Sequence, residues 1–154
     1  MARLKKLSPG FLGLLLLACP FLWTGLLWGA EYSVYGNPYT LVTIGTTTIK
    51  AEVVQSPEKL FLGLSQRPEL PAGRGMLFIM PSQDFQQFCM RGMRFSLDFI
   101  WIARGKVIGL HKNIAADDPG TLTSPEPVRY VLEVPGGFCD KHGLRINDPV
   151  KFTL

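Results

Sequence analysis

The chain has 154 residues, a formal net charge of +4, three cysteines and two histidines. This length predicts one domain with a short appendage. Arg3, Lys5 and Lys6 lie at the N-terminus, and from Glu31 onward 13 basic residues face 12 acidic ones. Because nucleic-acid binding requires a basic excess on the folded domain, we exclude nucleic acid as a partner.

The N-terminal residues 1–30 predict a signal peptide or a membrane anchor. A basic start is followed by an uncharged apolar run at 11–28, close to the length that spans a bilayer. Three outcomes remain open: a retained anchor, which we favour, lipidation at Cys19, and cleavage after Ala30. Each places the residues from Glu31 onward on the extracytoplasmic side, in the periplasm or at the cell exterior.

The remaining residues predict a linker at 31–39 and a domain at 40–154. Strands are expected at 40–44 and 46–55 as a hairpin, and a helix from Ser56-Pro57-Glu58 to about Arg67. Further strands are expected at 76–80, 88–90, 97–103, 106–112, 128–134 and 150–154, with one helical turn within 136–142. Together they predict a mainly β (α+β) fold, a compact, largely antiparallel barrel-like or sandwich sheet with one short packed helix.

Asp98 is the residue whose position most suggests chemistry. It begins an apolar strand and shares a face with the two isoleucines that follow, where a carboxylate must be paired or hydrogen-bonded. Arg91 and Arg94 are the nearest partners in sequence. Asp98 is therefore an acid/base or ligand anchor or, as we favour, a structural salt bridge or turn cap that fixes residues 83–96.

Three other charged residues allow both a functional and a structural interpretation. The guanidinium of Arg67 could bind an anion, but capping of the helix carbonyls or pairing with Glu69 is favoured. Arg129 and Glu133 share one face of their strand about 13 Å apart, too far for a direct ion pair. The favoured interpretation of these two is a solvated face, with pairing across the sheet as the alternative.

Cys89 and Cys139 remain once the N-terminal segment is set aside. In an oxidising compartment they could form a structural disulfide closing a loop of about 50 residues. Two separate buried thiols are the nearly balanced alternative. A redox pair is the third, for which the usual C-x-x-C spacing is absent.

No cofactor or metal motif is recognisable in the sequence. His111 and His142 have no metal-ligand spacing, and neither a G-x-S-x-G elbow nor a phosphate-binding glycine motif occurs. We therefore expect no cofactor and no metal.

Two further features could contribute to a binding site. The methionines at 76, 80, 90 and 93 could line an adaptable pocket, although core packing is the commoner use. The loop at 113–127 is long for a compact domain, which makes it a candidate lid or partner contact.

Several short motifs follow one another between residues 63 and 148. They are Gly63-Leu64-Ser65 with Arg67, Gly75-Met76-Leu77-Phe78, Phe88-Cys89-Met90-Arg91 with Ser96-Leu97-Asp98, Tyr130 to Glu133 with Gly136-Gly137, and Gly143-Leu144 with Asp148. In order and spacing they resemble the DUF192 family, also called UPF0127. The resemblance covers nearly all of residues 41–154 and implies a compact β-rich domain, exported or tethered at the cell envelope, with no cofactor. The family has no established biochemical function.

The chain departs from the family pattern in one segment. Cys89, Gly92, Met93 and Ser96 stand where that pattern has larger or polar residues. If this segment is the family's site, its role is altered or lost in this chain. The candidate ligand-binding residues are Arg67, Met90, Arg91 and Asp98.

Three functions remain open. The favoured one is a non-enzymatic extracytoplasmic domain, membrane-tethered or secreted, that binds a small ligand or an envelope protein. The second is a hydrolase or lyase that uses Asp98 with Arg91 or Arg67. The third is a thiol-redox accessory that uses Cys89 and Cys139. The sequence shows no nucleophile–base or metal constellation, which favours the first.

Overall fold

A computed structural model describes residues 31–154. The predicted anchor or signal segment at 1–30 lies outside the described residues, and so does Cys19. Within the described part, no helix is long and apolar enough to cross a membrane. The elements are β1 (Tyr39–Ile44), β2 (Thr47–Val54), α1 (Pro57–Leu62), β3 (Arg74–Asp84), β4 (Gln87–Phe88), β5 (Leu97–Ala103), β6 (Lys106–Ile114), β7 (Leu122–Thr123), β8 (Val128–Pro135), α2 (Phe138–Lys141) and β9 (Val150–Lys151).

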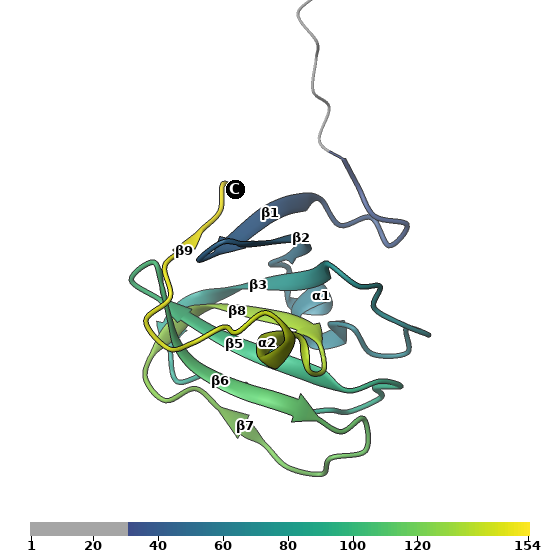
Figure 1. The fold of residues 1–154 in the computed structure, drawn as a ribbon. Helices are drawn as coiled ribbons and strands as arrows, with labels where there is room; N and C mark the ends of the chain where they lie inside the picture. The colour runs from purple at the N-terminus through teal and green to yellow at the C-terminus, as the bar shows by residue number, and fades with distance from the viewer. Residues whose placement is uncertain (1–30) are drawn as a thin grey trace, which may run out of the picture.

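Seven of these strands form one curled sheet in the order β6-β5-β8-β3-β2-β1-β9 (Figure 1). All neighbouring strands are antiparallel except β2 and β3, which are parallel. The C-terminal segment joins the two edges, because Val107 N donates to Asp148 O and Gly45 N donates to Pro149 O, each at 3.0 Å. The predicted fold class, a mainly β, largely antiparallel, barrel-like sheet with a short helix, is confirmed.

The central strands of the sheet are buried on both faces. The inner face packs against α2, and the outer face is covered by α1 and by the segments around β4 and β7. Figure 1 shows α2 in front of the sheet and α1 behind it. The prediction of a half-buried strand at 128–134 was therefore wrong at its C-terminal half, since every residue from Val131 to Val134 is buried.

Helix α1 begins as predicted and ends earlier than predicted. The Ser56 hydroxyl caps it by accepting from Lys59 N at 3.4 Å. Gly63 ends it with φ +51°, and a Cβ at Gly63 would lie 3.2 Å from the ring of Phe78. Because only glycine combines this backbone with so close an approach, the helix stops at Leu62.

The two predicted hairpins, β1–β2 and β5–β6, are both present. In the second, Arg104 and Gly105 have φ +52° and +67°, as a two-residue turn between twisted strands requires. The segment predicted as a linker is packed rather than free. Tyr39 belongs to β1, and Ser33 and Asn37 donate to the carboxylate of Glu52 at 2.9 and 2.7 Å.

Candidate functional site

Asp98 is a structural carboxylate in this fold. It is fully buried on the inner face. Asn113 N and Gly137 N donate to its Oδ1 at 2.6 and 2.9 Å, and Cys139 N donates to its Oδ2 at 2.7 Å. Gly137 is the N-cap of α2 and has no side chain to cap it, so Asp98 does so from β5. Neither predicted partner, Arg91 or Arg94, pairs with Asp98, and the carboxylate ties β6 to α2 rather than fixing the loop before β5.

Arg67 forms a buried, two-pronged ion pair with Glu52. Its Nη1 and Nη2 donate to Oε1 and Oε2 at 2.5 and 3.0 Å, and the two residues are only 7% and 6% exposed. The guanidinium also lies 3.8 Å from the ring centroid of Tyr35. The predicted roles of Arg67, helix capping or pairing with Glu69, were wrong.

The hydrogen bonds to Glu52 decide its charge state. Burial by itself would raise the pKa of Glu52, but hydrogen bonds from Arg67, Asn37 and Ser33, together with the positive charge of Arg67, hold that pKa below its usual value. Glu52 is therefore ionised at neutral pH, and it neutralises Arg67.

The two cysteines are separate free thiols. Cys139 is buried in the inner core, whereas Cys89 is exposed and borders a pocket on the outer face. Burial and the neighbouring Asp98 carboxylate raise the pKa of Cys139 far above its usual value. The disulfide interpretation was therefore wrong, and a redox pair would need the two thiols on one side of the sheet.

Glu133 is a buried carboxyl that the sequence pattern assigned to a solvated face. It is 5% exposed and lies on β8 between Met76 of β3 and Phe99 of β5. Burial raises the pKa of Glu133 to about 8, the charge of Arg67 opposes that shift, and no hydrogen bond from residues 31–154 contributes to it. Glu133 is thus protonated at neutral pH. Arg129, on the same face, is exposed as predicted.

A pocket of about 200 Å³ lies over Glu133 on the outer face, and we call it the Glu133 pocket. It is enclosed by α1, the residues that follow α1, β3, and the segment 87–93. Apolar side chains line one part of it, with Phe78, Met80, Phe88 and Met93, and polar atoms make up about half of its wall. Within the part of the chain that the structure describes, Glu133 is thus a carboxyl without a hydrogen-bond partner at the edge of a partly apolar pocket.

The mouth of the Glu133 pocket carries an aromatic ring and a cation. Phe61 on α1 is 72% exposed, and the Arg91 guanidinium lies 4.2 Å from its ring centroid. Ser65 also borders the pocket, and its hydroxyl donates to Arg91 O at 2.9 Å. This contact fixes the segment after β4 against the segment after α1.

Of the four candidate ligand-binding residues, only Arg91 borders the Glu133 pocket. Met90 is buried in the outer core, and it borders a shallower hollow with the long loop at 116–119. Both interpretations of the four methionines, core packing and pocket lining, apply in part. Met76 and Met90 pack in the core, whereas Met80 and Met93 line the Glu133 pocket.

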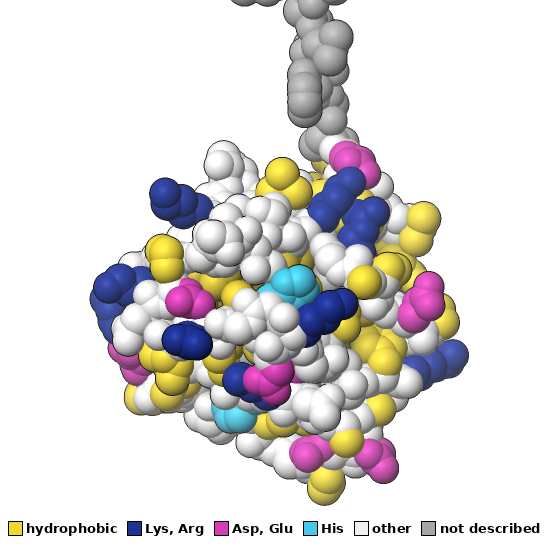
Figure 2. Space-filling model, viewed as in Figure 1, with side chains coloured by type: hydrophobic (Ala, Val, Ile, Leu, Met, Phe, Trp, Pro, Cys, Tyr) yellow, Lys and Arg dark blue, Asp and Glu magenta, His cyan; other side chains and the backbone are white. Residues whose placement is uncertain are grey.

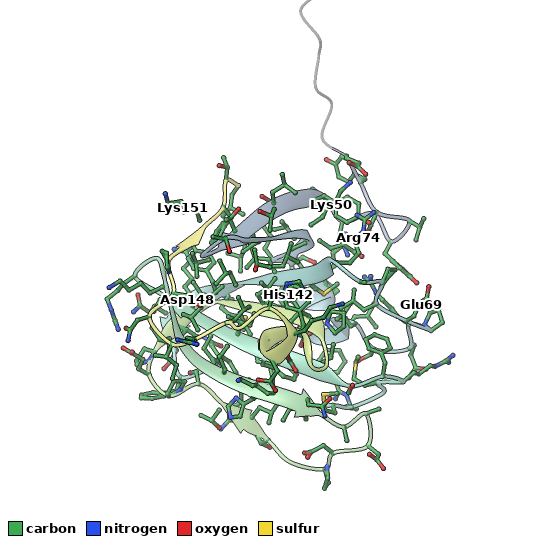
Figure 3. All side chains as sticks on the ribbon, in the orientation of Figure 1. Lys50, Glu69, Arg74, His142, Asp148 and Lys151 are labelled. Atoms are coloured by element: carbon green, nitrogen blue, oxygen red, sulfur yellow. The ribbon has the colours of Figure 1, made fainter. Side chains whose placement is uncertain are left out.

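The surface of the domain carries mixed charge. On the face shown in Figure 2, basic and acidic side chains are interspersed among apolar and neutral ones. Lys50 and Arg74 lie near each other where the described chain begins, and Glu69 lies on the adjacent loop (Figure 3). None of these three residues borders the Glu133 pocket, so they serve as positions for control variants.

Comparisons with known proteins give the same fold. A protein of unknown function from Novosphingobium aromaticivorans DSM 12444 is 27% identical, with a TM-score of 0.75 over 80% of this chain and 92% of that one. A protein from Sinorhizobium meliloti 1021, described as a candidate transcription regulator, is 24% identical, with a TM-score of 0.72 over 80% of this chain and 98% of that one. No curated protein matches the chain.

The two solved chains consist almost entirely of this domain, so in both of them the fold forms without a further domain in the chain. The family model described as "Uncharacterized ACR", DUF192, matches residues 40–152. The chain therefore belongs to the DUF192 family, whose function is uncharacterised.

Proposed function

We propose that the chain is an extracytoplasmic domain, membrane-tethered or secreted, that binds a small ligand in the Glu133 pocket. The observation that carries the binding role is the Glu133 carboxyl, which is 5% exposed, has no hydrogen-bond partner among residues 31–154 and borders a pocket lined in part by apolar side chains. A carboxyl taken out of water without a partner destabilises a fold by several kcal/mol. A ligand that supplies the missing partner would recover this free energy as affinity.

The alternative functions find less support in the geometry. Both oxygens of Asp98 accept from backbone N–H groups, and its side chain has no exposed surface. An acid/base catalyst needs an oxygen that reaches a substrate. The thiol-redox alternative would need Cys89 and Cys139 together, and they lie on opposite sides of the sheet.

The proposed location rests on the sequence of residues 1–30, with its basic start and uncharged apolar run. The full chain with alkaline phosphatase at its C-terminus is expected to be enzymatically active in bacterial cells, because this reporter needs an oxidising compartment. A matched fusion of residues 31–154 alone should be inactive. Equal activity of both fusions, or none from either, would contradict the location.

The proposed binding site is tested by a thermal-shift screen of residues 31–154 against small polar compounds. We expect at least one compound to raise the melting temperature in proportion to the logarithm of its concentration. Glu133→Gln should reduce this shift, and Cys89→Trp should abolish it by filling the pocket from its exposed edge. Glu69→Gln changes an exposed carboxyl outside the pocket and should leave the shift intact. If wild type and the three variants show equal shifts, the ligand binds outside the Glu133 pocket. If no compound shifts the melting temperature, the small-ligand proposal fails and an envelope protein is the remaining candidate partner.

A further inference from the structure

Among residues 31–154, no cation forms an ion pair with Glu133. Arg67 is the cation whose charge acts on Glu133, but both of its terminal nitrogens donate to the two oxygens of Glu52. The charge of Arg67 acts on Glu133 only through space. Glu52, Arg67 and an ionised Glu133 together carry one net negative charge. A bound group with one positive charge would balance this buried set.

The other charged and titratable groups near the pocket do not supply that charge. Arg91 lies at the mouth, stacked on the exposed ring of Phe61. Cys89 is an exposed thiol at the edge. On β6, Nδ1 of His111 accepts a hydrogen bond from Trp101 Nε1 at 2.8 Å, and burial lowers the pKa of His111. His111 is therefore neutral at neutral pH and adds no positive charge.

The aromatic and methionine side of the pocket wall suits an apolar group that carries a cation at one end. Phe78 and Phe88 pack edge-to-face, with ring centroids 5.0 Å apart, and Met80 and Met93 lie beside them. Aromatic rings stabilise a desolvated cation more than aliphatic walls do. The volume of about 200 Å³ limits the body to a few carbon atoms.

We propose that the ligand of the Glu133 pocket is a small apolar molecule with a primary ammonium group, which pairs with the Glu133 carboxylate at the floor. This inference rests on the proposed function of the same pocket. A ligand carboxylate would be repelled at the floor and attracted to Arg91 at the mouth, so acids of the same size should bind less well. A neutral alcohol could accept a hydrogen bond from the protonated carboxyl of Glu133 but would form no ion pair, so it should also bind less well.

Binding of an ammonium requires a proton to leave the protein. Near neutral pH the Glu133 carboxyl holds its proton, and the ammonium keeps all three of its own. The O–H bond of Glu133 breaks, the proton passes to the buffer, and the carboxylate and the ammonium form an ion pair. Release of about one proton per ligand makes the affinity rise about tenfold per pH unit below the pKa of Glu133.

The test uses residues 31–154 with three probes of equal size: n-butylammonium, n-butanol and n-butyrate. We expect n-butylammonium to bind at least tenfold more tightly than the other two. Calorimetry at about pH 6.5 in buffers of different ionisation enthalpy should show the release of about one proton. In Glu133→Gln, which keeps the shape and lacks the acid, the preference for ammonium over alcohol and the rise of affinity with pH should both disappear. Glu69→Gln should retain both.

Two outcomes would overturn the inference, and they differ in what they leave standing. If n-butanol or n-butyrate binds as tightly as n-butylammonium, and Cys89→Trp abolishes that binding, the pocket is a ligand site for another class of molecule. If neither the three probes nor any compound of the wider screen binds, the proposed function fails together with the inference.

Discussion

Replacing Asp98 with asparagine is expected to lower the free energy of unfolding by about 3 kcal/mol. The amide oxygen of the variant can still accept from Asn113 and Gly137. Its NH₂ group, however, then faces the N–H of Cys139, which now donates to Oδ2 at 2.7 Å. The amide NH₂ and the N–H of Cys139 would then face each other as two donors in a buried site, and neither would have an acceptor. The hydrogen bonds from Asn113 and Gly137 would also weaken, because the acceptor no longer carries a negative charge. Urea unfolding of residues 31–154 at neutral pH measures the change.

Asp140→Asn is the matched control for this prediction. Its side chain is 67% exposed and pairs with Lys112 on the surface, so its replacement should leave the unfolding free energy nearly unchanged. Amide hydrogen exchange in Asp98→Asn should accelerate most at Gly137 and Cys139, which mark the start of α2. If Asp98→Asn proves as stable as Asp140→Asn, the cap of α2 does not depend on this carboxylate.

Local signals predicted most of the fold. Ser56 and Pro57 fix the start of α1, and the short Arg104-Gly105 link permits only a tight hairpin. These signals act between neighbours in sequence, so they can be read without the fold. By contrast, β4 and β7 have two residues each and no periodicity. The sequence predicts a strand at 88–90 in place of β4 and none at β7, because pairing of the two strands with each other and packing of Phe88 on Phe78 hold them in place.

The residues of the candidate site were harder to predict, because distant pairing brings them together. Glu52 and Arg67 meet only because β2 and β3 are parallel and the chain returns over the outer face, a pairing that local pattern does not show. The alternating pattern of the strand at 128–134 predicts one solvated face, and this prediction wrongly places Glu133 on that face. A signal was present: Glu133 stands between apolar residues on both sides, in the run Val131-Leu132-Glu133-Val134, which is typical of a strand buried on both faces.

Glu133 is also expected to make the unfolding free energy fall as the pH rises from about 4.5 to about 8. Burial raises its pKa from 4.5 to about 8 in the folded protein, so in this range the folded state binds more protons than the unfolded state. Stability must then decrease with pH until Glu133 is ionised in both states, and above pH 8 this contribution is constant. Each unit of pKa difference corresponds to about 1.36 kcal/mol, so the whole decrease is on the order of 5 kcal/mol.

Glu52 should act in the opposite direction and at lower pH. Its pKa is lowered in the folded protein, so the stability it contributes is present above its unfolded pKa and is lost as the pH falls through the folded value. Wild-type stability should therefore pass through a maximum near pH 5, with the acid side set by Glu52 and the alkaline side by Glu133.

Glu133→Gln isolates the alkaline side, because the amide has nearly the same shape and no acidic proton. Urea unfolding at pH values of about 5, 6.5 and 8.5 should find the variant close to wild type at the lowest value and more stable by several kcal/mol at the highest. Glu69→Gln alters the exposed carboxyl seen on the loop in Figure 3. Its unfolding free energy should differ from that of wild type by the same small amount at all three pH values. A constant difference between Glu133→Gln and wild type would mean that Glu133 is ionised at all three pH values in the folded protein, stabilised by solvent in the pocket or by a counter-ion. In that case the reason for expecting an ammonium ligand would also be lost, since the carboxylate would already be stabilised without one.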